Sequence, residues 1–315
     1  MQVVPPLPAI SQRKPSKEIV AEIIKFSNSE KVATAKKQLS AATLAVTDYS
    51  AETRRIDKTK PVAPLLINFG GDFENPKYRA ALRAYEKQLT KFENLLAKIG
   101  ERRLKVVEQY QIARNGIREI EIEAHQFFTV DKPIAVQFTG VPISAELQKG
   151  AAFVNQVVSS TLTNAENLTT RIVNNTAGRA SSDGNSIFIR VDETASQMAH
   201  ELGHILEQHL TTAGNAFSRN SPELLGEVAI RYRESRTIGE SWEKLSEVTG
   251  DPYADYEVTK KDKFYDEYTG RRGNGLHASE IITMGLQHMY DDPIGFATND
   301  PDHLEFMLTL LRGSE

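Results

Sequence analysis

The sequence predicts an α+β protein in which a long-helix, coiled-coil-like N-terminal region precedes a domain that combines a small sheet with helices. Before about residue 123, apolar residues recur at alternating steps of three and four, the period of a helix packed along a partner helix. After Phe128, short segments of strand composition alternate with helical ones. We therefore expect a helical hairpin or coiled-coil arm over residues 1–130 and an α+β domain over residues 131–315.

Composition excludes several classes of protein. The 315 residues carry 38 Lys and Arg against 42 Asp and Glu, a formal net charge of −4. Because a dedicated nucleic-acid binder needs a cationic surplus to neutralise phosphates, we expect no nucleic-acid partner. Cysteine is absent, which excludes disulfides, thiolate catalysis and Cys-ligated metals. A bound metal ion would have to use His, carboxylate or backbone oxygen ligands.

The sequence also lacks export and membrane signals. Early prolines and charges interrupt the first thirty residues, where a signal peptide would need an apolar core. No apolar run approaches the roughly 20 residues of a spanning helix. We expect a cytoplasmic protein without a membrane partner, and virion association or delivery by a route other than Sec remains open.

The segment 76–123 is predicted to form one long helix with Pro76 at its first position. Its stripe consists of Leu82, Tyr85, Leu89, Phe92, Leu96, Ile99, Val106, Tyr110, Ala113, Ile117 and Ile120. A helix of about 45 residues would be about 65 Å long, so it needs a partner along its length. The segment 16–49 keeps the same spacing and is the expected partner, with 50–75 as connector. Packing of one helix on the other is enough to explain the stripe. The alternative roles for this arm are oligomerisation, assembly with another chain, inhibition of the second domain and anchoring.

The C-terminal region is predicted to mix strands and helices. Asp183-Gly184-Asn185 is a hairpin signal, and Thr194-x-x-Gln197 matches a capping box at the start of a helix. The expected strands are 134–138, 171–173 and 186–191, and the expected helices are 144–162, 194–210, 222–236, 278–291 and 302–311.

The helix expected at 194–210 contains His200-Glu201-Leu202-Gly203-His204. Spacing of four residues brings both imidazoles onto one helix face, about 40° apart, where they can bind one ion. Imidazole nitrogens suit Zn²⁺, and a catalytic zinc site keeps one position for water. Glu201, next to the first ligand, would reach that water and is the candidate general base. Uncharged neighbours indicate a buried helix, on which polar side chains need partners.

Residues 187–191 and 199–205 resemble the edge strand and active-site helix of the zincin metallopeptidases. The likeness departs from the metzincin form, because Glu207 and Leu210 occupy the positions of its glycine and third histidine. His209 lies about 140° around the helix from His204 and is expected to be solvated. The resemblance implies that the third zinc ligand is a carboxylate on a later helix, as in gluzincins.

Two segments offer this carboxylate: Glu223 and Glu227 follow the motif closely, and Glu280 lies much farther along. Residues from 178 onwards resemble, more specifically, the metallopeptidase-like domains of bacteriophages and mobile elements. The residues that carry this likeness are Gly178-Arg179-Ala180, Ser279-Glu280-Ile281-Ile282-Thr283-Met284-Gly285 and the tail Tyr290-Asp291-Asp292-Pro293-Ile294-Gly295-Phe296. The resemblance implies Glu280 as the ligand. Glu280 also heads an apolar run, where an unpaired buried charge would be unfavourable.

The resemblance implies a zinc-dependent metallopeptidase that hydrolyses a protein or peptide substrate, with Glu201 accepting a proton from the metal-activated water. The implied zinc ligands are His200, His204 and Glu280. Developing negative charge needs a further electrophile, and Tyr268 is the candidate from a segment that also holds Arg271, Arg272 and His277.

Other residues have expected supporting roles. Instead of stabilising the developing charge, Arg271 is expected to bind either a carboxylate of the substrate or a neighbouring acidic side chain. Arg179 is expected to pair with a carboxylate near the site. The strand 186–191 is expected to offer backbone groups to an extended peptide at the sheet edge. The alternative function is a phage or mobile-element structural or host-interaction protein whose zinc-stabilised zincin-like domain is not catalytic. A proteolytic toxin or effector would use the same site.

Overall fold

The computed structural model describes residues 14–162, 167–176, 178–183, 185–209, 224–272 and 279–313. Long N-terminal helices precede a small mixed four-stranded sheet with packed helices, so the predicted α+β class is confirmed. The chain divides into two compact units. Residues 29–120 form the arm unit, and residues 1–28 with 121–315 form the sheet unit.

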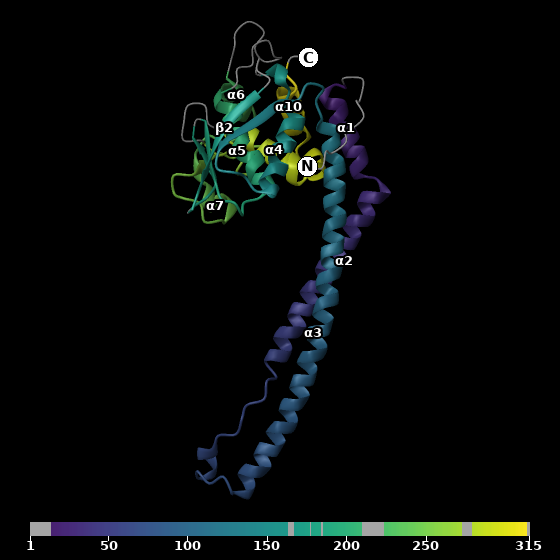
Figure 1. The fold of residues 1–315 in the computed structure, drawn as a ribbon, viewed down its shortest axis with the longest axis vertical. Coiled ribbons are helices and arrows are strands. Elements are labelled where there is room, and N and C mark those ends of the chain that lie inside the picture. Colours follow the sequence, from purple (N-terminus) through teal and green to yellow (C-terminus); the bar gives the residue numbers. More distant parts are fainter. Residues whose placement is uncertain are drawn as a thin grey trace. The chain divides into compact units, whose positions relative to one another are not determined.

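The arm unit pairs two long helices. Helix α2 (Glu30–Asp57) runs beside α3 (Pro76–His125), which contributes its residues up to 120 to this unit (Figure 1). The buried α3 positions recur every seven residues, at Phe92, Ile99, Val106, Ala113 and Ile120. On α2, buried Ala35, Ala42 and Ile56 keep the same repeat. This is the spacing of a coiled-coil seam and agrees with the expected helical hairpin.

The predicted helical stretch 16–49 differs from the structure in two respects. It is broken at Asn28, so that α1 (Ser16–Ser27) is a separate helix that packs on α9 (Pro293–Asn299) and α10 (Pro301–Leu311) of the sheet unit. Ser29 is the N-cap of α2 and accepts a hydrogen bond from Val32 N at 3.4 Å, which explains the restart. Helix α2 then continues to Asp57, because 50–57 contains neither Gly nor Pro. The connector is therefore shorter than predicted and includes a 3₁₀ turn, η1 (Leu66–Phe69).

The four-stranded sheet has the order β1-β2-β4-β3. Its strands are β1 (Ala135–Gly140), β2 (Asn167–Asn174), β3 (Ser181–Asp183) and β4 (Ser186–Ile189). Strands β1, β2 and β4 are parallel, and β3 pairs antiparallel with β4, as the hairpin signal predicted.

One prediction about the sheet is wrong. The strand predicted at 186–191 is not an edge, because β4 lies between β2 and β3. The hairpin places β3 on one side of β4, and β2 pairs parallel with β4 on its other side. The edge strand at this side of the sheet is β3.

Helices complete the sheet unit, and α5 lies at its centre. The larger helices are α4 (Ala145–Val157), α5 (Ala195–His209), α6 (Leu225–Arg236), α8 (Ile281–Asp291), α9 (Pro293–Asn299) and α10 (Pro301–Leu311). Helix α5 packs against α4, α8 and the β3–β4 hairpin, and it buries Leu202, Ile205 and Leu206 completely. Burial on several sides makes α5 a rigid support for its polar residues.

Smaller elements were not predicted: η2 (Gln126–Phe128), η3 (Ser160–Leu162), β5 (Glu243–Lys244), α7 (Leu245–Thr249), β6 (Val258–Thr259) and the helix α9. A strand of two residues is too short to show the alternation of apolar and polar residues that predicts a strand, so β5 and β6 were not predicted. Among the described helices, none is both long enough and apolar enough to cross a membrane.

Candidate metal centre

The predicted capping box starts the helix that carries the motif. Thr194 N donates to Gln197 Oε1 at 2.8 Å, and Gln197 N donates to Thr194 Oγ1 at 3.3 Å. This reciprocal pair satisfies free amides at the start of α5. The helix then continues through His200 and His204, so both imidazoles project from one face of a firmly anchored element.

Both imidazoles face one carboxylate oxygen. Glu280 Oε2 lies 3.4 Å from His200 Nε2 and 3.6 Å from His204 Nε2. Ligand atoms from the three residues all lie within 4.8 Å of one another. Ligands about 2.1 Å from a tetrahedral zinc ion are roughly 3.4 Å apart, so the two His–Glu distances match edges of such a tetrahedron. Among the described residues, this is the one group of three that could hold a metal ion.

Glu280 reaches the histidines because α5 and α8 approach closely. It is the N-cap of α8 and is 2% exposed. A Cβ atom at Gly203, between the two histidines, would lie 2.8 Å from Thr283 Cα on α8. Thr283 Oγ1 donates to Glu280 Oε2 at 2.9 Å, and Arg271 Nη1 donates to Glu280 Oε1. The carboxylate is thus held in place on both of its oxygens.

A second layer of hydrogen-bond acceptors orients the two imidazoles. His200 Nδ1 lies 3.0 Å from Gln287 Oε1, and His204 Nδ1 lies 3.7 Å from Glu207 Oε2. With Nδ1 directed at an acceptor, Nε2 of each ring is left to face Glu280. Such outer partners fix the tautomer and orientation of metal-binding histidines.

Glu207 has a further contact that sequence reasoning missed. Its buried carboxylate accepts hydrogen bonds from Ser279 Oγ at 2.7 Å, Ser279 N at 3.2 Å and Ile282 N at 3.4 Å, at the start of α8. Glu207 follows His204 by three residues and so lies one helical turn away from it. This spacing is the only sequence signal for the contact between Glu207 and the His204 ring. Its contact with α8 depends on how the two helices pack and has no sequence signal.

The charges around the site favour a cation. Burial lowers the pKa of His200 to about 4, so this ring is neutral. Burial also acts to lower the pKa of His204, but the carboxylates of Glu207 and Glu280 raise it to about 9. Burial acts to raise the pKa of Glu280, yet the two imidazoles and Arg271 bring it below its usual value. An ionised Glu280 therefore faces the Nε2 atoms.

Glu201 combines burial with an unpaired oxygen. It is 4% exposed, and its Oε2 has no hydrogen-bond partner among the described residues. Burial raises the pKa of Glu201 to about 7. The charge of Glu280 adds to this rise in pKa, and His204 opposes it. A carboxyl group with a pKa near neutrality can both accept and return a proton. A buried oxygen without a partner also points to a missing polar group at this position.

Tyr268 lies at the same site. Its ring centroid is 6.4 Å from that of His200, and its hydroxyl oxygen accepts hydrogen bonds from Arg179 Nη2 at 3.0 Å and Arg271 Nη1 at 2.9 Å. Burial, with Glu280, raises the pKa of Tyr268 to about 12, so it keeps its proton. Arg179 Nη1 lies 3.3 Å from Glu257 Oε1, in agreement with its expected pairing to a carboxylate.

The other sequence candidates lie elsewhere. Among the described residues, Glu227 is not part of the His/His/Glu group and lies in the first turn of α6. Glu223, His277 and the side chain of His209 fall outside the described residues. Arg271 binds a neighbouring acid, Glu280, which was one of its two expected partners.

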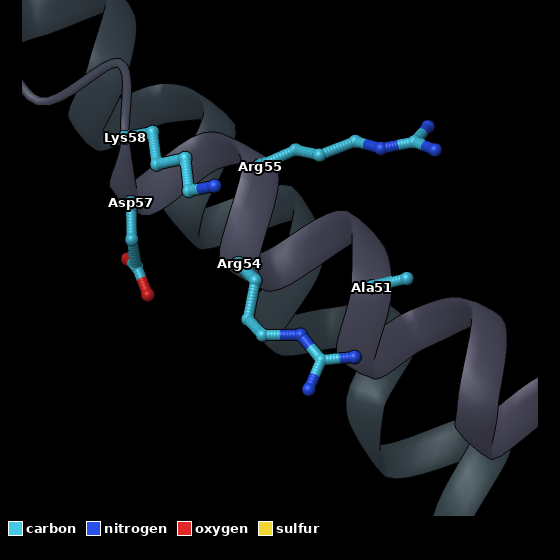
Figure 2. A pocket seen from close by; sticks show the side chains of 5 residues that line it. All are labelled: Ala51, Arg54, Arg55, Asp57 and Lys58. Atoms are coloured by element: carbon cyan, nitrogen blue, oxygen red, sulfur yellow. The ribbon is translucent and has the colours of Figure 1, made fainter.

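A separate hollow lies on the arm unit, at the C-terminal end of α2 (Figure 2). Ala51, Arg54, Arg55, Asp57 and Lys58 line it. This cationic surface has no imidazole and a single carboxylate, so it lacks the ligands of a divalent metal ion.

Comparisons with known proteins add nothing to this geometry. No family model matches the sequence, and no curated protein or solved structure matches it.

Proposed function

We propose that this chain is a zinc-dependent metallopeptidase of the zincin type with a gluzincin-like ligand set. The observation that carries the proposal is the convergence of both imidazole Nε2 atoms on Glu280 Oε2, on the same helix as a buried glutamate with an unpaired oxygen. The motif thus combines metal ligands with a candidate base. A site that only stabilises the fold has no need of that base.

The donor set favours zinc over harder cations. Mg²⁺ and Ca²⁺ prefer six or more oxygen ligands, whereas the site offers two imidazole nitrogens and one carboxylate oxygen. Two nitrogens and one oxygen suit a tetrahedral zinc site whose fourth position remains for water or substrate. When bound, zinc supplies Lewis acidity and lowers the pKa of a coordinated water toward roughly 7.

Glu201 would move the proton in the reaction. Its Oε2 accepts a proton from the attacking water while the water oxygen bonds to the carbonyl carbon of the peptide. Glu201 then delivers this proton to the leaving nitrogen as the C–N bond breaks. The products are a carboxylic acid and an amine, and Glu201 returns to its starting state. Its pKa of about 7 suits both transfers.

Tyr268 would stabilise the negative charge that develops on the carbonyl oxygen. Because Arg179 and Arg271 both donate to its oxygen, the hydroxyl hydrogen is directed away from them and is available to another acceptor. Its raised pKa keeps that hydrogen in place at neutral pH. A preorganised donor of this kind acts where charge develops in the transition state.

The edge strand β3 is the proposed contact for an extended substrate. Because β4 lies between β2 and β3, the strand that offers a free edge is Ser181–Asp183 and not β4. Ser182 also forms a side-chain hydrogen bond with Glu201, which ties the edge to the catalytic residues. A peptide added to this edge would bind through its backbone, so sequence selectivity has to come from other contacts.

Metal analysis and a matched set of variants test the proposal. We expect about one zinc ion per purified chain, and loss of zinc in His200→Ala and His204→Ala. Glu201→Gln should retain zinc and lose at least about 10²-fold in hydrolysis of a peptide library. Glu247→Gln, which removes an exposed carboxylate from α7, is the control and should retain both properties.

Two results would contradict the proposal. Equal zinc content in the wild type and the histidine variants would show that the metal binds elsewhere. Zinc at the site without cleavage of any peptide by the wild type would favour the alternative of a zinc-stabilised, non-catalytic domain.

A further inference from the structure

A cluster of cations surrounds the single tryptophan of the chain. Trp242 lies between α6 and β5 and is 40% exposed. Lys260 Nζ lies 5.1 Å from its ring centroid, Arg272 Cζ 5.5 Å and Arg233 Cζ 5.9 Å. These four residues form the Trp242 cluster. The indole quadrupole attracts each cation, but the cations repel one another.

The cations of the Trp242 cluster differ from Arg236 and Arg271 of the sheet unit, which form ion pairs within the described residues. Arg236 lies 2.6 Å from Asp300, and Arg271 pairs with Glu280. Within the part of the chain that the structure describes, no carboxylate oxygen lies within 4.0 Å of the three cations of the cluster. The chain as a whole has a net charge of −4, so this concentration of positive charge runs against its overall balance.

Arg233 of the cluster is affected most by burial, and Arg272 is the cation that acts on it. Burial lowers the pKa of its guanidinium, and the positive charge of Arg272 lowers it further. Glu234 and Glu207 act in the opposite direction but do not reverse the shift. An anion placed among the cations would relieve their repulsion and accept hydrogen bonds from their N–H groups.

We propose that the Trp242 cluster is a binding site for an acidic segment of polypeptide. Carboxylates of the segment pair with Lys260, Arg272 and Arg233, and the exposed indole packs against its apolar atoms. Arg272 directly follows Arg271, the partner of Glu280, so the cluster is joined by the backbone to the wall of the metal centre. The choice of a polypeptide ligand rests on the proposed peptidase function. The net charge of −4 disfavours a nucleic acid.

Tryptophan fluorescence tests the proposal directly, because Trp242 is the only tryptophan. The full-length Glu201→Gln variant is titrated with a peptide of alternating Glu and Gly, with the same peptide carrying Gln in place of Glu, and with inorganic phosphate. Calorimetry is run in parallel. We expect saturable binding of the Glu peptide that weakens with salt, and no binding of the Gln peptide.

Charge variants locate the site. The double variant Lys260→Gln, Arg272→Gln should weaken binding of the Glu peptide about tenfold or more. Lys244→Gln is the matched control: Lys244 lies close to Trp242 in sequence but pairs with Asp255 at 2.8 Å, so its loss should leave the affinity within about twofold.

Several results would overturn the proposal. These are the absence of both a fluorescence and a heat change with the Glu peptide, equal affinity in the double variant, and phosphate binding as tight as peptide binding. Tighter binding of a single-stranded oligonucleotide would assign the cluster to nucleic acid instead. These titrations measure binding and need neither zinc nor hydrolysis. They therefore test the Trp242 cluster even if the chain proves not to be a peptidase.

Discussion

Replacing Gly203 by alanine tests whether the close approach of α5 and α8 creates the metal centre. The added Cβ would lie 2.8 Å from Thr283 Cα, 3.1 Å from Thr283 Cγ2 and 3.2 Å from Thr283 N. Non-bonded carbon atoms rest about 3.5–4.0 Å apart, so the start of α8 has to move away by about 0.7–1.2 Å. Glu280, the N-cap of α8, moves with it.

The energetic consequences have opposite signs and can be compared. Alanine is a better helix former than glycine by about 1 kcal/mol. Overpacking of a tight contact costs about 1–3 kcal/mol, so after the helix gain of about 1 kcal/mol we expect Gly203→Ala to lower the free energy of unfolding by up to about 2 kcal/mol. A shift of this size takes Glu280 Oε2 from 3.4 Å and 3.6 Å to beyond 4 Å from the imidazoles. We therefore expect zinc affinity to fall about 10- to 100-fold.

Urea denaturation of the metal-free protein measures stability, and competition with a chelator measures zinc affinity. The control is Gly100→Ala in α3, where an added Cβ meets no atom within 4 Å. The control should gain about 0.5–1 kcal/mol and leave zinc binding unchanged. If Gly203→Ala gains stability as the control does and binds zinc as tightly as the wild type, the reasoning about helix approach is refuted.

Three further variants test individual side chains. Glu207→Gln should weaken zinc binding about 10- to 100-fold, because the carboxylate near His204 is lost. It should also alter the absorption spectrum of the Co²⁺-substituted protein. If the spectrum and the zinc affinity are both unchanged, Glu207 does not orient His204. Tyr268→Phe should leave zinc content unchanged and lower kcat about 10²-fold, and an unchanged kcat would remove the hydroxyl from the reaction. Thr194→Ala should lower the free energy of unfolding, measured by urea titration, by about 1 kcal/mol, because the hydroxyl that accepts from Gln197 N is lost. Equal stability of the variant and the wild type would show that this cap contributes little.

Sequence patterns were reliable where a single element determines the outcome. The seven-residue repeat of α3 follows from helix geometry, and Phe92 and Ile99 are buried as the stripe predicted. The capping box at Thr194 needs residues of one turn only. The placement of His200 and His204 on one face likewise depends on the rise and rotation of α5 alone.

Predictions that depend on two elements were less complete. From the residues alone, Glu223, Glu227 and Glu280 were all candidate third ligands, and it is the packing of α8 on α5 that brings Glu280 to the imidazoles. The place of β4 inside the sheet was mispredicted, since a strand's neighbours come from distant parts of the chain.

The amino-acid sequence by itself determined the helical arm, the α+β class, and the His-Glu-His spacing on one face of a helix, because these features follow from interactions between residues a few positions apart. Tertiary structure alone decided that Glu280 completes the group, that Glu207 links His204 to the start of α8, and that three cations gather around Trp242. The contacts of Glu280 with the imidazoles, of Glu207 with Ser279 and of Trp242 with Arg272 join residues tens of positions apart, and no local periodicity encodes them.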